Sequence, residues 1–194
     1  FLFMIILVAI LAYILGSIPS GYIIGKNFFK SDIRDLGSGN IGSTNALRNF
    51  GKKAGIATFI LDVLKGFLAI VLGNKLSEYN GMSIAFLFVV LGHMYSLFLH
   101  FKGGKGVATS FGALLYIDYK FALIMIGVFA LVVLISHIVS LASLVATVST
   151  AIGGYIRFGN SHMFWVLLII TVLIFYSHRS NIKRLIDRQE AKIF

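Results

Sequence analysis

The sequence predicts an all-α integral membrane protein with seven transmembrane helices. Its 194 residues are 58% hydrophobic and only 12% charged, with a mean hydropathy of +0.94, whereas soluble domains carry about 25% charged residues. Apolar runs near the length of roughly 20 residues that a helix needs to cross a bilayer alternate with short polar breaks. We expect a single polytopic domain over residues 1–194 and a monomer.

The predicted spans, in chain order, are Leu2–Ile24, Ala54–Gly73, Met82–His100, Val107–Ile117, Phe121–His137, Leu141–Ile156 and His162–Ser177. Because apolar runs continue after the first, Leu2–Ile24 is expected to be a true span and not a cleaved leader. The fourth is short and is open to a second interpretation, as a re-entrant half-helix. Residues 121–156 hold no polar loop, so the chain must fold back near Ser136–Ser143, where small polar side chains can satisfy the backbone.

The distribution of basic residues predicts the orientation. With seven spans and the first loop inside, only Lys75, Lys120 and Arg157 lie outside. If the fourth segment merely dipped into the bilayer, the basic tail 179–192 would lie outside, against the positive-inside bias. We therefore predict the N-terminus outside and the C-terminus in the cytoplasm. Orientation in the bilayer also explains the net charge of +10 better than nucleic-acid binding does, so no nucleic-acid partner is expected.

A loop of three glycines and two lysines, Phe101–Gly106, interrupts the apolar sequence and is here named the glycine loop. Glycine lets successive N–H groups point at one anion, and lysine adds a full charge. The loop lacks Walker A spacing, so nucleotide hydrolysis is unsupported. A basic anchor for lipid headgroups would explain the lysines but not the clustered glycines. We predict that Gly103, Gly104, Gly106 and Lys105 bind a phosphate.

The segment Arg34–Arg48, here named the first loop, is dense in small hydrogen-bonding residues. Its glycines match a dinucleotide fingerprint, but no strand precedes them and no βαβ unit surrounds them. What remains is a flexible backbone with donors and a guanidinium that binds phosphate in a bidentate fashion. The candidates are Ser38, Asn40, Thr44, Asn45 and Arg48. An ordinary polar loop that caps the next helix is the alternative.

Ionisable groups inside predicted spans are costly and mark internal partners or sites. Asp62 and Lys65, one helical turn apart, are predicted to form a structural ion pair. His93 in the third span is a candidate ligand for substrate. His178 and Asn181, also one turn apart after the last span, are expected to project into a shared site. No cluster of metal ligands can be assembled and no nucleophile elbow occurs, so no metal or cofactor is expected.

At these residues the chain resembles the PlsY family, bacterial acyl-phosphate:glycerol-3-phosphate acyltransferases. The resemblance runs nearly end to end and rests on Gly16–Gly21, Asp35–Asn40 with Thr44, Asn45 and Arg48, Leu61–Gly66, Gly92–Tyr95, Phe101–Thr109 and His178–Ile182. It implies transfer of a fatty acyl group from a long-chain acyl phosphate to the 1-hydroxyl of glycerol 3-phosphate. The products are lysophosphatidic acid and phosphate, in phospholipid biosynthesis. It also implies a multi-pass protein of the bacterial inner membrane, among membrane lipid, with its active site on the cytoplasmic face.

The same resemblance implies roles for matching positions. Ser38, Arg48, His178 and Asn181 are the expected catalytic residues. The glycines at 103, 104 and 106 are expected to bind glycerol phosphate. Further expected substrate contacts, some from the resemblance and some from residue chemistry, are Asn40, Thr44, Asn45, His93, Lys105 and Ser143, with Ser140 as the alternative to Ser143.

Two phosphate-bearing substrates require cations and backbone donors with few acids, which these segments provide. Because acyl phosphate is already activated, we expect direct attack without an acyl-enzyme, with the proton removed by His178 or by a substrate phosphate oxygen. Two other classes of protein fit these residues less well. A transporter would show repeat symmetry and polar residues at mid-membrane, and a lipid-binding scaffold leaves the glycines and His178 without a task.

Overall fold

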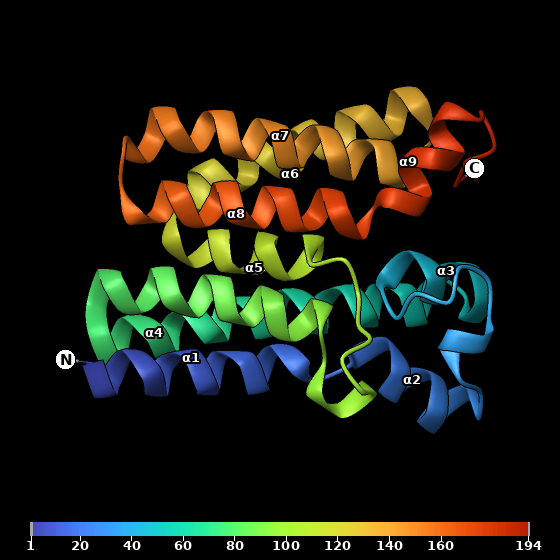
Figure 1. The fold of residues 1–194 in the computed structure, drawn as a ribbon. Helices are drawn as coiled ribbons and strands as arrows, with labels where there is room; N and C mark the ends of the chain where they lie inside the picture. The colour runs from blue at the N-terminus through green and yellow to red at the C-terminus, as the bar shows by residue number, and fades with distance from the viewer. Residues whose placement is uncertain (1, 194) are drawn as a thin grey trace. The chain divides into compact units, whose positions relative to one another are not determined.

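The computed structural model describes residues 2–193, and its regular structure there is helical throughout (Figure 1). The all-α prediction is therefore confirmed. The chain divides after Ile117 into two compact units, each described by itself. The first contains α1 (Leu2–Ser17), α2 (Ser20–Phe29), η1 (Ile33–Asp35), α3 (Ser43–Phe50), α4 (Lys52–Met94), η2 (Leu97–Leu99) and α5 (Val107–Ile117). The second contains α6 (Tyr119–Ser136), α7 (Val139–Phe158), α8 (His162–Ser177) and α9 (Arg179–Ile186).

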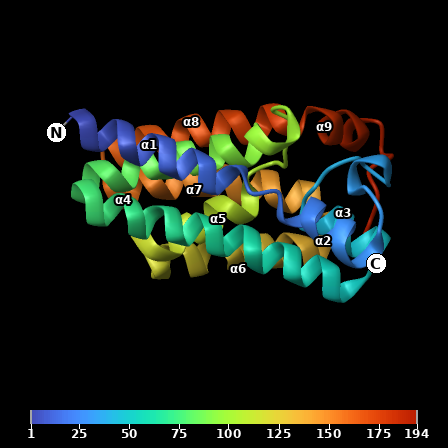
Figure 2. The ribbon, with the colours of Figure 1, turned by 90° about the horizontal axis from the view of Figure 1, so that it is seen from below.

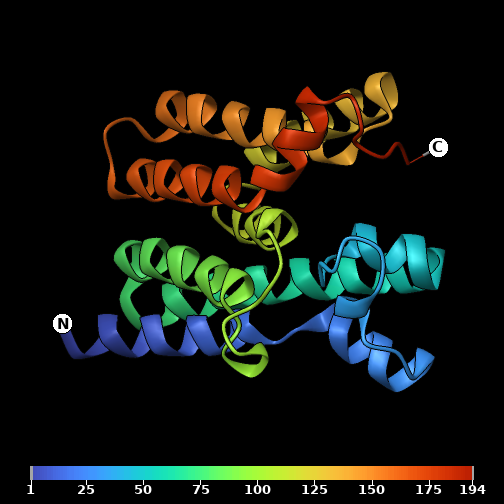
Figure 3. The same ribbon diagram turned by 45° about the vertical axis from the view of Figure 1, so that its right-hand side comes forward.

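The first predicted span is two helices, because α1 ends at Ser17 and α2 begins at Ser20 (Figure 3). Pro19 at the break has no N–H to donate and disfavours the helical conformation at Ile18. The predicted first span, Leu2–Ile24, is therefore made of two helices, and by length and hydropathy the segment Leu2–Phe29 is one candidate membrane span. The break leaves backbone carbonyls that need partners from elsewhere in the fold.

Helix α4 is a hairpin of two helices, the second and third predicted spans, which run side by side in Figures 1 and 2. The turn lies at Ser77 and Glu78, whose backbone angles are not helical; Glu78 has φ 47°. Gly73 and Gly81 face each other across this hairpin, since a Cβ on either would overlap the carbonyl oxygen of the other. Small residues thus allow the two halves to approach closely.

Helix α5 packs on α4 through two glycines. A Cβ on Gly66 would overlap the carbonyl oxygen of Thr109, and a Cβ on Gly112 would overlap that of Val63. At 11 residues α5 is as short as the sequence predicted. Its N-terminus follows directly on the glycine loop, so α5 anchors one end of that loop on α4.

In the second unit, α6 and α7 fold back on each other at His137 and Ile138, as predicted for residues 136–143. The Oδ1 atom of Asp118 accepts a hydrogen bond from the N–H of Phe121 and caps α6, while Oδ2 pairs with Arg157 at the end of α7. The segment after α9 lies against the α6–α7 turn, because the N–H of Ile193 donates to the carbonyl of His137.

By length and hydropathy, the described residues contain four segments able to cross a bilayer: 2–29, 52–99, 119–136 and 139–158. The pair α8 and α9, bent by 60°, makes a fifth if it is one span. The segment 52–99 is counted once although it contains the α4 hairpin. The prediction of an integral membrane protein is confirmed, whereas the number of seven crossings and the side of each terminus stay predictions.

Candidate substrate-binding site

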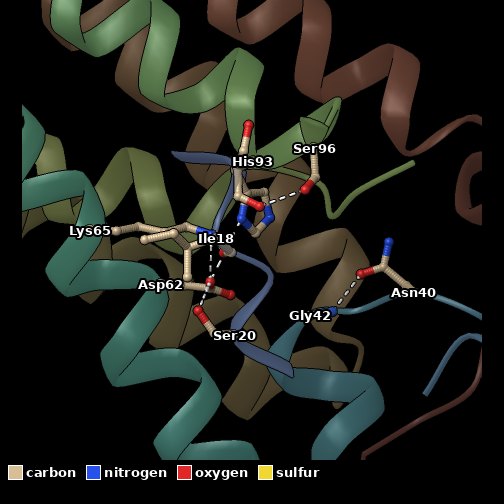
Figure 4. A network of polar contacts seen from close by, with 9 residues as sticks. Ile18, Ser20, Asn40, Gly42, Asp62, Lys65, His93 and Ser96 are labelled. Carbon is tan, nitrogen blue, oxygen red and sulfur yellow. Dashed lines mark hydrogen bonds and ion pairs between the residues drawn. The ribbon is translucent and has the colours of Figure 1, made fainter. Parts of the chain in front are cut away.

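A buried charged cluster lies beside the break between α1 and α2 (Figure 4). Oδ1 of Asp62 accepts a hydrogen bond from Oγ of Ser20 at 2.9 Å and pairs with Nζ of Lys65 at 2.9 Å. Nζ of Lys65 also donates to the carbonyl of Ile18 at 2.9 Å. The predicted Asp62–Lys65 pair is confirmed, and it has a further task, because Lys65 supplies a partner to a carbonyl that the break exposes.

A second set of contacts supports the same break. Oγ of Ser96 donates to the carbonyl of Ser17, and the N–H of Leu97 donates to Oγ of Ser17 at 3.2 Å. Both carbonyls next to the break, those of Ser17 and Ile18, are thus paired. The segment after α4 is held against the end of α1 by these bonds.

His93 lies between this cluster and the glycine loop. Its side chain is buried, and Nδ1 stands 3.7 Å from Oδ1 of Asp62, too far for a hydrogen bond. On the other side, the N–H of Gly104 donates to the backbone carbonyl of His93 at 2.9 Å. A Cβ on Gly104 would overlap Nε2 of His93. The imidazole therefore lies under the glycine loop.

The other glycines of this loop are also explained by geometry. A Cβ on Gly103 would overlap the carbonyl oxygens of His93 and Met94. Gly106 has φ +85°, a conformation that side chains disfavour. The glycines predicted to bind phosphate thus also have a structural role, because the loop can lie on the end of α4 only without side chains at these positions. Lys105 is half-buried in this loop.

The first loop is organised by Asn45, whose side chain is buried. Its Nδ2 group donates to the carbonyls of Ile33, Leu36 and Asn40 at 3.2, 3.0 and 2.8 Å. Its Oδ1 accepts from the N–H of Ser38 at 3.1 Å and from Nδ2 of Asn49 at 2.9 Å. Asn45 thus holds the loop in shape, and its predicted contact with substrate stays a prediction.

The remaining first-loop candidates lie nearer the surface. Ser38 and Arg48 are exposed, and Asn40 and Thr44 are half-buried. Oδ1 of Asn40 accepts from the N–H of Gly42. The N-cap residue of α3 is Gly42, without a side-chain cap, so these polar side chains do not serve as the helix caps that the alternative interpretation required.

The first loop and the chain before the glycine loop share one apolar cluster, formed by Ile33, Ile41, Ala46 and Leu99 with Tyr22 and Phe50 around it. This cluster lies in the first unit and joins the first loop to the chain that leads into the glycine loop. The segment with His178 and Asn181, after α8, belongs to the second unit.

Asp32, which lies just before the first loop, is firmly ionised. Asp32 accepts hydrogen bonds from the backbone N–H and the guanidinium of Arg34, which lower the pKa of its carboxyl to about 2. The same bonds raise the pKa of Arg34. Such a carboxylate is a poor general base, because it holds a proton only in strong acid.

In the second unit, His178 ends α8 and is buried. Its Nδ1 atom donates to the carbonyl of Ile174 at 2.9 Å. Since a carbonyl can only accept, the neutral ring carries its proton on Nδ1 and its lone pair on Nε2. Ser143, by contrast, uses its hydroxyl on the Val139 carbonyl of its own helix at 2.9 Å.

Glu190 connects three donors in the second unit. Its Oε1 accepts from Nδ2 of Asn181 at 2.6 Å and from Oγ of Ser140 at 2.8 Å, and its Oε2 pairs with Arg184 at 2.6 Å. Burial alone would raise the pKa of the Glu190 carboxyl, but these hydrogen bonds outweigh it and leave the pKa lowered. The predicted residue Asn181 is therefore oriented by a carboxylate.

Sequence reasoning assigned no role to Ser20, Ser96 or Glu190. For Ser20 a signal existed, since it follows the proline that breaks the first span. Nothing local links Glu190 to Ser140, which lies 50 residues away. Within residues 2–193 no group of three or more His, Cys, Asp or Glu side chains is arranged to hold a metal ion.

The profile described as glycerol-3-phosphate acyltransferase matches residues 6–188. The chain belongs to this family. A relative of that name from Carboxydothermus hydrogenoformans is 45% identical over 190 residues, which are 98% of this chain and 97% of the relative. One from Fusobacterium nucleatum is 42% identical over 184 residues, 94% of this chain and 95% of the relative.

Two solved structures agree with this family fold. The crystal structure of PlsY (YgiH), an integral membrane glycerol 3-phosphate acyltransferase, in its glycerol 3-phosphate form has a TM-score of 0.93 and 38% identity. It covers 98% of this chain and 96% of that one. The lysophosphatidic acid form of PlsY has a TM-score of 0.89, also with 38% identity, and covers 98% and 95%. The predicted resemblance is confirmed, and this family member is an acyltransferase of lipid biosynthesis and an integral membrane protein.

Proposed function

We propose that this chain transfers a fatty acyl group from acyl phosphate to the 1-hydroxyl of glycerol 3-phosphate, giving lysophosphatidic acid and inorganic phosphate. The observation that carries the proposal is the glycine loop, with Gly104 bonded to the end of α4 and Lys105 in the same loop. A bare backbone with a lysine suits the phosphate of glycerol 3-phosphate. The solved relative with glycerol 3-phosphate supports this substrate.

The chemistry needs little from acidic side chains. The hydroxyl oxygen of glycerol 3-phosphate attacks the acyl carbonyl carbon, and the bond from that carbon to the phosphate oxygen then breaks. The donor is already activated, so binding and orientation supply most of the rate enhancement. Asp32 and Glu190 are both engaged by cations and donors, which supports direct transfer without a carboxylate base.

Two groups are proposed as acceptors of the hydroxyl proton. One is Nε2 of His178, which carries the lone pair of the neutral ring. The other is a phosphate oxygen of the substrate itself. Asn181, oriented by Glu190, is proposed to donate to the oxyanion or to the departing phosphate.

Residues of the first loop take the remaining roles. Ser38 and Arg48, both exposed, are proposed as direct substrate contacts, with Asn40 and Thr44 beside them. Asn45 acts by keeping the N–H of Ser38 in place. Ser143 is proposed as a weaker contact, because its hydroxyl is bonded to its own helix.

We propose a monomer in the bacterial inner membrane, with seven crossings and the N-terminus outside. The basic residues of the first loop, the glycine loop and the tail then face the cytoplasm, where glycerol 3-phosphate is found. That orientation follows the positive-inside bias.

The test supplies purified protein with glycerol 3-phosphate and either palmitoyl phosphate or palmitoyl-CoA, and follows release of phosphate or CoA. We expect phosphate release and lysophosphatidic acid only with palmitoyl phosphate. Arg48→Ala is expected to be inactive, whereas Lys53→Ala, at another exposed basic position, serves as the matched control. Turnover with palmitoyl-CoA alone would overturn the proposed donor.

A further inference from the structure

Asp62 is the central group of the buried cluster beside the α1–α2 break. Three side chains face it: Ser20, Lys65 and His93. A buried charged group costs free energy unless it is paired. Removal of one member of a buried ion pair leaves the charge of the other member uncompensated. Lys65 lies one turn away on the same half of α4, whereas Ser20 begins α2 and His93 lies near the end of the other half of α4. A buried carboxylate that faces these two other segments is suited to fix them relative to its own helix.

One of these contacts leads to the first loop. Ser20, bonded to Asp62, is the first residue of α2. The next residue, Gly21, touches the first loop directly, because a Cβ there would overlap the carbonyl oxygen of Ile41. The position of α2 therefore sets the position of the first loop, and the bond from Ser20 to Asp62 holds the first residue of α2.

Another contact leads to the glycine loop. His93 faces Asp62 through Nδ1, and its ring and backbone carbonyl together hold Gly104. Any shift of the imidazole changes the space that Gly104 occupies. Among the described residues the buried Nδ1 atom has no hydrogen-bond partner, and it faces Oδ1 of the Asp62 carboxylate at 3.7 Å.

We infer that Asp62 is a positioning residue that holds both loops at once, the first loop through Ser20 and α2, and the glycine loop through His93. Only the identity of what these loops bind rests on the proposed function. The inference adds a group that touches no substrate and yet sets the distance between two substrate-binding segments, a distance on which rate depends steeply.

The test measures the position of each loop without substrate. The chain has no cysteine, so single-cysteine reporters are available at exposed Asp35→Cys in the first loop and exposed Lys102→Cys in the glycine loop. A third reporter, Lys120→Cys, lies in the second unit. Labelling by a water-soluble maleimide is followed in detergent for each reporter in four backgrounds.

The backgrounds separate the two contacts. Ser20→Ala is expected to change the labelling rate at position 35 alone, His93→Phe at position 102 alone, and Asp62→Asn at both. The expected change is about tenfold, because a displaced loop alters the charged neighbours of its cysteine and hence the thiolate fraction. The reporter at position 120 should not change. Ser83→Ala is the matched control, since Ser83 is equally buried on α4 and bonds the Tyr79 carbonyl of its own helix.

Kinetics give the second measurement. We expect Ser20→Ala to lower kcat, His93→Phe to raise KM for glycerol 3-phosphate about tenfold, and Asp62→Asn to do both. If Asp62→Asn does not fold, the double variant Asp62→Asn with Lys65→Met, which removes both charges, is used in place of the single variant. Unchanged labelling in Asp62→Asn, or a changed labelling rate at all three positions, would overturn the inference. If the labelling rates change as expected but the parent protein transfers no acyl group, the proposed function is overturned and the inference about Asp62 is not.

Discussion

The Cα of Gly104 lies against the imidazole of His93, with no room for a methyl group between them. His93 is buried and its backbone carbonyl also accepts from the N–H of Gly104. The glycine loop is therefore shaped by the helix end beneath it as well as by any anion above it. A methyl group added at Gly104 is therefore expected to displace the glycine loop.

Substitution of Gly104→Ala is expected to raise KM for glycerol 3-phosphate by about tenfold and to lower kcat less, because the added Cβ displaces the loop from His93. Steady-state kinetics over glycerol 3-phosphate concentration measures both constants. Gly127→Ala is the control, since a Cβ there meets nothing within 4 Å. An unchanged KM would contradict this role of the loop.

Gly103→Ala should be more damaging to stability than Gly104→Ala. At Gly103 the added Cβ meets two backbone carbonyl oxygens, which cannot rotate away as a side chain can. We expect the free energy of unfolding to fall by about 3 kcal/mol, the upper range for overpacking. Thermal melts of the two variants in the same detergent compare them, and a higher Tm for Gly103→Ala would count against this explanation.

Asn45→Asp keeps the size of the side chain but replaces its donor group with oxygen. Three carbonyls then lose their donor and face a carboxylate oxygen, so we expect a loss of about 3 kcal/mol. We also expect little activity, because the loop that carries Ser38 is distorted although Oδ1 can still accept from the Ser38 N–H. Melting and initial rates measure the two effects. Asn160→Asp is the control, since that exposed residue needs only its Oδ1 atom, which accepts from Trp165. Equal effects of the two variants would refute the role of Asn45.

Glu190 predicts an acid dependence of stability. Its pKa in the folded protein lies below the ordinary value of 4.5, so the carboxylate stabilises the fold above that pH, and this contribution is lost as the pH falls through the folded value. We expect the Tm of the parent to fall in acid more steeply than that of Glu190→Gln. Melts from neutral pH to below 4.5 compare their slopes, and parallel curves would contradict the prediction.

Direct transfer predicts that Ser38 never carries the acyl group. Protein mixed with palmitoyl phosphate in the absence of glycerol 3-phosphate should show no added acyl mass, and hydroxylamine should release no palmitoyl hydroxamate from it. Intact-protein mass spectrometry makes the measurement, with Ser38→Ala as the reference. An acyl adduct present in the parent and absent in Ser38→Ala would establish a covalent route instead.

Local patterns predicted much of the helical structure. The short helix α5, the fold-back at residues 136–143 and the Asp62–Lys65 pair follow from apolar length, small polar residues and a spacing of one helical turn. The apolar length of residues 2–24 predicts a span but not the break at Pro19. The proline itself is the local signal for that break, because it lacks an N–H and restricts the residue before it.

The sequence by itself determined that this protein is helical and belongs in a membrane, and which family its short motifs resemble, because composition and local spacing suffice for those properties. Only the tertiary structure decided that Asn45 holds the first loop and that Glu190 orients Asn181. It also decided that His93 lies between Asp62 and Gly104. Those contacts join residues far apart in the chain or across a turn, and the distance between such residues is set by packing and not by their spacing in sequence.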